Sequence, residues 1–595
     1  MPEPGSQTPR DFETSAPTTP AVAEPPTATA QSTQAVPKDP PPAGSMSTKP
    51  VSSPPVSPAP APVVLAPLAP VALVQRQPTF GPQWSGPGGR AAPAVLVAAG
   101  AAGLAAAAAL PWDRPGVGWL ATALVAAAAT VGAAWARGAG TGVSANVGTD
   151  AVRADVTGRA GAGTRIARVL WAIAALALVG VGAVRAASWL FVLCLLAACV
   201  SGSLSLAGGR SVRALFLGTV AVPIATIRAL PWTVRGLLAI RSRTGGSAAR
   251  TAAAVAVGVA LLVIFGALFA GADAAFAKVL QDILPTVDAG VVSRWLFSFA
   301  VLGLGTIGAC FLALAPPSFD GEPSQRRPLR RIEWALPVGG LVVLFAAFVG
   351  VQATILFGGG DHVLRTAGLT YAEYARSGFW QLLAVTVLTL VVLGIAARKA
   401  ARQTLADRIW LRSLLGGLAA LALVVVASAL SRMWAYEQAY GFTQLRLLVS
   451  VCEVWLGVVF VFVIVAGVRL HIHAMWLPRA VVGTAVVALL GIAALNPDRF
   501  IAEQNLIRYE KTGNIDLDYL SQLSADAVPV LDRLPEPQRT CVLVDIDADL
   551  DRTGPDDWHG WNLGRTQARA TLADYRAPDT RVSASCRVLR LSTRS

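Results

Sequence analysis

The stretch LLVSVCEVWLGVVFVFVIVAGV, residues Leu447–Val468, is apolar over almost its whole length. Each residue of an α-helix adds about 1.5 Å, so about 20 apolar residues cross a hydrocarbon core that is about 30 Å thick. One carboxyl side chain, Glu453, interrupts this otherwise apolar run. The stretch therefore predicts a helix that spans a membrane.

Similar apolar runs follow one another from Pro93 onward. Hydrophobic residues make up 54% of the chain and charged residues 14%, against about 25% charged in soluble domains. A helix satisfies its own backbone hydrogen bonds in lipid. We therefore predict an all-α fold, a polytopic membrane helix bundle of about eleven spans, near Pro93–Leu110, Gly118–Ala136, Ala167–Val184, Ala187–Leu206, Thr251–Ala270, Trp295–Ala315, Trp334–Leu356, Phe379–Ala397, Leu411–Leu430, Leu447–Val468 and Trp476–Leu495.

Residues 211–240 differ from these runs. Prolines interrupt the segment and a tryptophan lies among its arginines. Such a segment suits a position along the membrane surface. We expect it to be interfacial, on the strength of Arg213, Pro223, Arg228, Pro231, Trp232 and Arg235.

The two ends of the chain are polar. Residues 1–90 are rich in Pro, Ala, Ser and Thr, and cannot bury enough apolar surface to offset the entropy of ordering. We expect a disordered tail there, a bundle over residues 91–495, and a small, mostly helical domain over residues 496–595. In that last domain we expect helices over Asp498–Tyr509 (ending near Gly513), Asp516–Leu523 and Ser524–Leu534, and one from Asp557 with Trp561, Arg565, Ala568, Leu572 and Tyr575 on one face.

The charge distribution predicts the orientation. The net charge is +14. Lys and Arg gather in the loops that are cytoplasmic if the N-terminus is inside, so the positive-inside rule predicts a cytoplasmic N-terminus and an extracytoplasmic C-terminus. The excess of Arg over Lys and the abundance of Ala indicate a GC-rich bacterial genome, and hence a multi-pass protein of the bacterial cytoplasmic membrane. No basic run interleaved with aromatics is present, so we expect no nucleic-acid partner.

Polar and aromatic residues gather in three segments on the predicted extracytoplasmic side, beginning at Gly358, Arg432 and Asn496. One interpretation is an aromatic belt that anchors helix ends at the interface. The other is a binding site on the outer face, for which the candidate residues are Asp273, Asp361, Tyr374, Arg376, Arg432, Tyr436, Glu437 and Tyr440.

Glu453 lies about two turns inside a span. An ionised side chain there costs about 3 kcal/mol on insertion scales, so the group should face the bundle interior, pair with an arginine, or be protonated. The run Gly303-Leu-Gly-Thr-Ile-Gly matches a dinucleotide fingerprint, but it lies within a span and small-residue helix packing explains it better. His471 and His473 lack further metal ligands. We expect no catalytic residues, no metal and no cofactor.

Six cysteines are present. Cys194, Cys199, Cys310 and Cys452 lie in apolar runs, where a thiol behaves as a small hydrophobe. The other two lie in the polar C-terminal domain, on the predicted oxidising side of the membrane. We predict a disulfide between Cys541 and Cys586.

Several of these segments carry a resemblance: Ala270-Gly-Ala-Asp-Ala-Ala-Phe-Ala, Tyr374-Ala-Arg-Ser-Gly-Phe-Trp-Gln-Leu, Tyr436-Glu-Gln-Ala-Tyr-Gly-Phe-Thr-Gln-Leu-Arg, and the Asn496 segment with Asp526-Ala-Val-Pro. Over roughly Thr251–Leu534 the chain resembles the bacterial membrane proteins of the domain-of-unknown-function 4153/4173 family, common in actinobacteria and other Gram-positives. The resemblance implies a membrane location and no assigned chemistry.

Three functions remain open at this point. One is a non-catalytic envelope sensor or scaffold, which envelope or membrane proteins could bind through the tails. Another is a transport-type protein that uses Glu453. The third is an envelope transferase for lipid-linked substrates, which would need Asp113, Asp273 or Asp361 with Arg376 or Arg432. We favour the two non-enzymatic functions, with the lipid bilayer as the surrounding partner.

Overall fold

A computed structural model describes residues 86–140, 154–209, 211–243, 247–283, 289–317, 329–357, 379–402, 404–468, 476–573 and 586. The chain divides into two units, Met1–Gln75 and Arg76–Ser595, and all described residues belong to the second. Most of the tail expected over residues 1–90 therefore lies outside the described residues.

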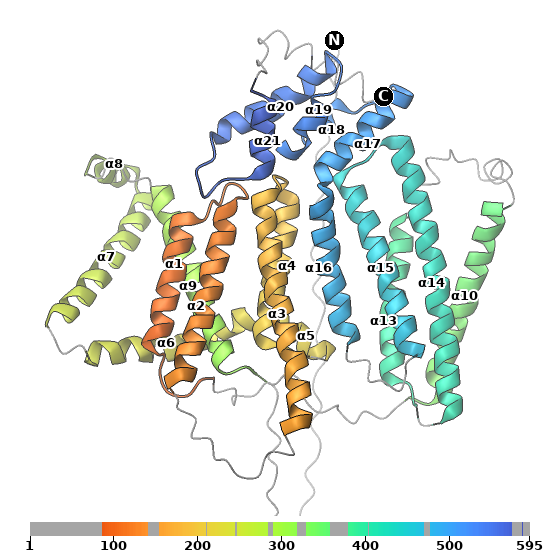
Figure 1. Cartoon of the computed structure of the whole chain (residues 1–595), viewed down its shortest axis with the longest axis horizontal. Helices are drawn as coiled ribbons and strands as arrows, with labels where there is room; N and C mark the ends of the chain where they lie inside the picture. Colours follow the sequence, from red (N-terminus) through yellow and green to blue (C-terminus); the bar gives the residue numbers. More distant parts are fainter. Residues whose placement is uncertain are drawn as a thin grey trace, which may run out of the picture. The chain divides into compact units, whose positions relative to one another are not determined.

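The second unit is all-α in its described part, as predicted (Figure 1). Its helices before residue 496 are α1 (Pro93–Ala109), α2 (Val117–Gly140), α3 (Ala154–Val184), α4 (Ser188–Ala207), α5 (Val212–Thr219), α6 (Ala221–Arg243), α7 (Ser247–Ala272), α8 (Ala274–Ile283), α9 (Ala289–Leu314), α10 (Arg331–Phe357), α13 (Phe379–Lys399), α14 (Leu405–Tyr440), α15 (Gln444–Val468) and α16 (Leu477–Leu495). The C-terminal elements are α17 (Pro497–Thr512), α18 (Leu517–Leu520), η1 (Ala525–Ala527), α19 (Val528–Leu531), α20 (Gln538–Thr553) and α21 (Leu563–Thr571).

Nine helices in the described ranges are long and apolar enough to cross a membrane. The two other expected spans coincide with α1 and α7, which contain shorter apolar stretches. The segment expected to be interfacial forms α5 and α6, which meet at a 60° bend. If that bent pair counts as one broken span, the number of spans rises to ten. The chain is thus a multi-pass membrane protein by the length and composition of its helices.

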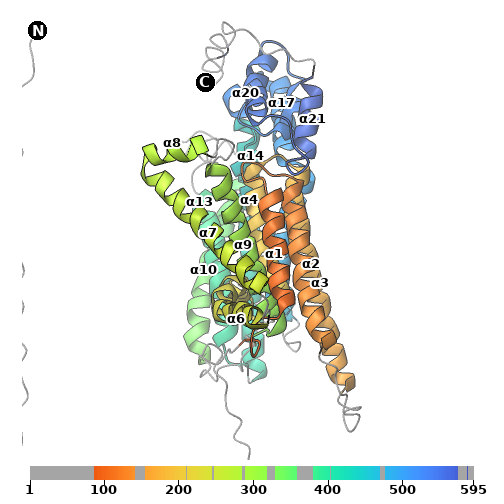
Figure 2. The same cartoon turned by 90° about the vertical axis from the view of Figure 1, so that its left-hand side faces the viewer.

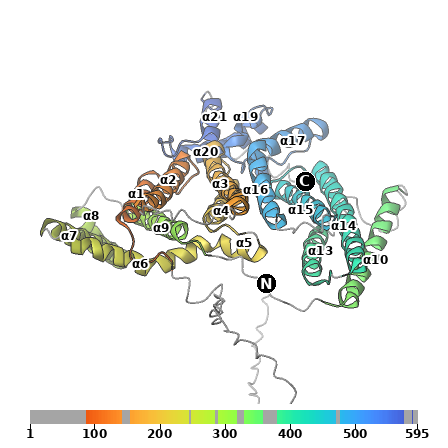
Figure 3. The same ribbon diagram turned by 60° about the horizontal axis from the view of Figure 1, so that its bottom comes forward.

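Three buried clusters hold these helices together. One joins α1, α6 and α9, where an added Cβ on Gly308 would lie 2.8 Å from the backbone nitrogen of Thr226. Gly308 therefore serves close helix packing, as predicted for this run, and a Cβ on Gly303 would lie 3.4 Å from the Ala99 carbonyl oxygen, whereas one on Gly305 would meet no atom within 4 Å. A second cluster joins α10, α13, α14 and α15. The third joins α3 and α4 to α16, and side chains of α15 pack against it. Helix α16 therefore lies between the helices of the first cluster and those of the second (Figure 3).

Helices α17–α21 gather at one end of the spanning helices (Figures 1 and 2). We call residues 496–573 the C-terminal domain. The predicted first helix is confirmed as α17, which ends at Gly513 in a left-handed conformation (φ 72°). The helix predicted from Asp557 is corrected: α21 begins at Leu563, because Asn562 accepts a hydrogen bond from the Arg565 backbone N–H and caps it. Helix α20 was not among the predicted elements.

Candidate functional site

Two polar regions stand out at the end of the bundle that carries the C-terminal domain. The first is a set of buried hydrogen bonds between this domain and the turns that join pairs of spanning helices. The second is the α14–α15 interface, which holds the predicted Tyr436, Glu437 and Tyr440 and leads toward Glu453.

Asp526 fixes the turn between α3 and α4. Its carboxylate Oδ2 accepts hydrogen bonds from the backbone N–H groups of Ala186 (2.7 Å) and Ala187 (3.2 Å). No side chain of α4 itself caps that helix, so the C-terminal domain supplies the cap. Burial raises the pKa of Asp526. Gly564 packs against the same carboxylate: a Cβ there would lie 1.9 Å from Oδ1.

The same turn is held from two more directions. Arg185 donates from Nε to the carbonyl of Ala493 (2.6 Å) and from Nη2 to that of Ala494 (3.1 Å), at the end of α16. Asn562 donates from Nδ2 to the carbonyls of Gly182 and Arg185, both at 2.8 Å. Helix ends leave carbonyls without intrahelical partners, so these contacts satisfy them.

We call these contacts between the C-terminal domain and the spanning helices the junction. Asp498 belongs to it and has no exposed surface. Its Oδ1 accepts hydrogen bonds from the Trp189 indole (3.3 Å) and the Gln444 amide (2.9 Å). Its Oδ2 accepts one from the Ser524 backbone N–H (3.0 Å). One carboxylate thereby ties α17 to α4, to α15 and to the segment before η1.

The turn between α1 and α2 is bound by Arg565. This side chain pairs with Asp556 (3.0 Å) and donates to the carbonyls of Pro115 (2.9 Å) and Gly560. Burial lowers the pKa of Arg565. The backbone N–H of Gly118 donates to the carbonyl of His559 (2.8 Å).

The turn between α14 and α15 is bound in the same manner. Asn505 exchanges two hydrogen bonds with the backbone of Phe442, at 3.1 and 2.9 Å. The Tyr519 hydroxyl accepts one from the Gln444 backbone N–H (2.7 Å), and burial raises the pKa of Tyr519 to about 12. The C-terminal domain is therefore fixed to three separate turns by buried polar groups.

The predicted outer-face residues are brought together only in part. On α14 the Tyr436 and Tyr440 rings lie 4.9 Å apart, and the Arg446 guanidinium lies 4.3 Å above the Tyr436 ring. Glu437 is buried and accepts a hydrogen bond from the Ser450 hydroxyl (3.4 Å). Arg432 lies two turns before Tyr440 on the same helix.

The other predicted residues lie elsewhere. Asp273 caps α8, accepting hydrogen bonds from the Ala275 (2.7 Å) and Phe276 (3.0 Å) backbone N–H groups. Helix α8 lies apart from α14 in Figures 1 and 3. Asp361, Tyr374 and Arg376 lie outside the described residues, as do both histidines of the His471-Ile-His run.

Glu453 is buried within α15, with 1% of its surface exposed. Neither carboxylate oxygen has a hydrogen-bond partner among the described residues. Gly457 lies one turn further along, and an added Cβ there would lie 3.5 Å from the Val426 side chain. Residues four apart share a helix face, so the Glu453 face of α15 is the face that packs against α14.

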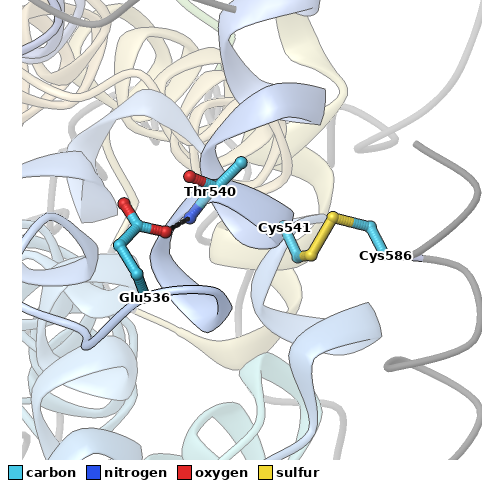
Figure 4. The surroundings of a disulfide bond; sticks show 4 residues. All are labelled: Glu536, Thr540, Cys541 and Cys586. Atoms are coloured by element: carbon cyan, nitrogen blue, oxygen red, sulfur yellow. Dashed lines mark hydrogen bonds between the residues drawn. A yellow bond between two sulfur atoms is a disulfide. The ribbon is translucent and has the colours of Figure 1, made fainter. Parts of the chain in front are cut away.

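The cysteines divide as the sequence indicates. Cys541, on α20, is joined to Cys586 by a disulfide, next to the Glu536–Thr540 hydrogen bond (Figure 4). The remaining four thiols are free. Within the described part of the chain, no group of three His, Cys, Asp or Glu side chains is arranged to hold a metal ion.

The family assignment rests on this membrane region. A family model described as Domain of unknown function (DUF4153) matches residues 172–534, which is more than half of the chain. The chain belongs to this family. The matched range includes Glu437, Glu453, Asp498 and Asp526. No curated protein and no solved structure matches the chain significantly.

Sequence reasoning missed Asp498, Asp526, Arg185 and Asn562. Asp498 and Asp526 lie in the segments that carry the family resemblance, which was the available signal. Their partners gave none: Asp526 and Ala186 are 340 residues apart in the sequence.

Proposed function

We propose that this protein is a transport-type membrane protein in which Glu453 binds and releases a proton, or binds a cationic group of the solute. The observation that supports this proposal is the burial of both Glu453 carboxylate oxygens without a partner in the described part of the chain. An unpaired ionised carboxylate in such surroundings costs several kcal/mol. A group that serves only packing would more economically be apolar.

Two polar side chains, Glu437 and Ser450, lie between the level of this carboxyl and one end of the bundle. Glu437 lies one turn from the end of α14, and Ser450 donates to it from α15. Glu453 follows Ser450 by three residues on the same helix face, about 4.5 Å deeper along the axis. The α14–α15 interface therefore holds two buried carboxyl groups with a hydroxyl between their levels, an arrangement suited to stepwise movement of protons.

Complementation of a deletion strain tests this proposal. We expect Glu453→Gln and Glu453→Leu both to fail to restore the deletion phenotype at normal membrane abundance. Glu453→Leu should also fold at least as well as the natural chain, because it removes an unpaired polar group from an apolar surrounding. Cys452→Ala, the neighbouring substitution, is the matched control and should restore the phenotype.

Two other results would contradict this proposal. If both Glu453 variants restore the phenotype, the carboxyl is dispensable and the transport proposal loses its support. If the leucine variant alone is absent from the membrane, Glu453 is a structural hydrogen-bonding group.

A sensor or scaffold is the second candidate, supported by a different observation. The C-terminal domain is tied to three inter-helix turns by buried groups, among them Asp498, Asp526 and Arg565. A ligand bound to that domain could therefore bias the arrangement of the spanning helices.

An envelope transferase has less support, because Asp113 is paired with Arg114 (3.1 Å) and Asp273 caps a helix.

For orientation we propose that the C-terminal domain is extracytoplasmic and that the N-terminal tail is cytoplasmic, in the cytoplasmic membrane of a bacterium. A disulfide in the C-terminal domain suits an oxidising compartment. The basic helix ends of α10, α13 and α14 lie at the opposite end of the bundle, as the positive-inside rule requires.

A further inference from the structure

Among the described residues, seven basic side chains lie at the ends of α10, α13 and α14 that are remote from the C-terminal domain. Helix α14 meets that domain at its Tyr440 end, so its Leu405 end is the distant one, and α13 ends and α10 begins beside it. We call this set the basic cluster; it consists of Arg330, Arg331, Arg398, Lys399, Arg402, Arg408 and Arg412.

Two contacts bring the three helix ends into one patch. The backbone N–H of Leu329 donates to the carbonyl of Lys399 (2.9 Å), which places the start of α10 beside the end of α13. Arg331 pairs with Asp407 (2.7 Å), which places the same segment beside the start of α14. The basic side chains are therefore gathered by the fold and are not scattered over separate loops.

The acidic groups within this patch are already engaged. Glu333 accepts a hydrogen bond from the Arg330 backbone N–H (2.9 Å). Asp407 is held by Arg331 and by the capping box with Thr404. In the described part of the chain, Arg331–Asp407 is the single ion pair of the basic cluster. The exposed side chains of Arg330, Arg398 and Lys399 leave a net positive surface.

Large exposed apolar side chains lie in the first turns of α10 and α14, the helices that carry part of the basic cluster. Ile332, Leu336 and Leu405 are each about three-quarters exposed, at 76%, 75% and 74%. Trp334, between the first two, is buried, and its indole N–H has no acceptor among the described residues. A ligand that fits both features carries a negative group and acyl chains. Free phosphate would satisfy only the charge.

We propose that the basic cluster binds the headgroup phosphate of an anionic phospholipid, with the acyl chains lying against Ile332, Leu336 and Leu405. Basic sites between spanning helices bind anionic lipid headgroups in this way. This inference is independent of the proposed transport function. The competing explanation is that these charges serve only to orient the protein in the membrane. That role does not require the basic side chains to be gathered in one patch, or Glu333 and Asp407 to be held by hydrogen bonds.

Native mass spectrometry of the full-length chain in detergent tests the inference, with phosphatidylglycerol and phosphatidylcholine of equal acyl length as the probes. The site variant is Arg330→Gln/Arg398→Gln/Lys399→Gln, because no described side-chain hydrogen bond or ion pair depends on these three groups. Its matched control is Arg165→Gln/Arg168→Gln/Arg235→Gln, which removes the same charge from exposed positions on α3 and α6. A charge-preserving variant carries Arg330→Lys and Arg398→Lys.

We expect retained phosphatidylglycerol adducts on the natural chain, the control and the lysine variant, and few with phosphatidylcholine. The site variant should lose phosphatidylglycerol affinity on the order of a hundredfold, because it removes the electrostatic attraction of three basic side chains to the anionic headgroup. An equal loss in the control would overturn the proposal, since binding would then follow total charge. Displacement of the lipid by inorganic phosphate at equal concentration would also overturn it, because the acyl chains would then contribute nothing.

Discussion

Replacing Asp498 with alanine should lower the free energy of unfolding by about 3–5 kcal/mol, because each orphaned buried group costs about 1–3 kcal/mol. The substitution leaves three partly buried donors without their acceptor: the Trp189 indole, the Gln444 amide and the Ser524 backbone N–H. No water replaces the carboxylate easily, since Asp498 has no exposed surface. Asp498→Asn keeps the shape and one acceptor, so it should cost less.

Thermal unfolding in detergent measures this effect. In a Cys199→Ala/Cys452→Ala background, a thiol-reactive fluorophore reaches Cys194 and Cys310 only when the bundle opens, because both are buried. Glu510→Ala is the matched control: Glu510 is exposed on the same helix, α17, and its loss should leave the midpoint nearly unchanged. Equal midpoints for Asp498→Ala and Glu510→Ala would show that the junction does not contribute to stability.

Removing the disulfide should have an effect of similar size. Cys541 and Cys586 are 45 residues apart in the sequence, and closing such a loop stabilises the folded state by about 3–4 kcal/mol in the chain-entropy model. We expect Cys541→Ala/Cys586→Ala to melt earlier, as followed by circular dichroism. A reductant should lower the melting temperature of the natural chain but not that of this double variant.

Alkylation gives the direct count. The denatured natural chain should take up four alkyl groups before reduction, at Cys194, Cys199, Cys310 and Cys452, and six afterwards. Six groups before reduction would mean that the pair is reduced in the cell. The extracytoplasmic placement of the C-terminal domain would then lose its support.

Much of the bundle could be predicted from the sequence, because an apolar run of spanning length has few alternatives to a helix in lipid. The helix at Asp498 could also be placed, since Gly513 supplies the left-handed residue that ends it. Helix α20 was not predicted, although its sequence contains a helical pattern. Its buried residues Val542, Leu543, Ile546 and Leu550 have helical spacing, although the alternation of apolar and acidic residues nearby obscures it.

The junction with the C-terminal domain could not be predicted. Asp526 and Arg565 act on turns hundreds of residues earlier in the chain, and nothing in their own segments identifies those partners. Arg565, Ala568 and Leu572 of the predicted helical face are buried, whereas Trp561 precedes α21 and is exposed, and Tyr575 lies outside the described residues. The start of α21 depends on Asn562, whose amide also holds the α3–α4 turn. Glu453 stood out from the sequence alone because a carboxyl within a span is costly wherever its helix packs.

Chemical labelling of Glu453 tests the central claim most directly. Dicyclohexylcarbodiimide partitions into lipid and adds to protonated carboxyl groups. If Glu453 is a neutral carboxyl that exchanges protons within the span, the natural chain should carry the adduct on the peptide that contains Glu453. The yield should fall as the pH rises, and Glu453→Gln should abolish the adduct on that peptide. A Glu453 peptide labelled no more than that of Glu503, a partly exposed carboxyl on α17, would contradict the account.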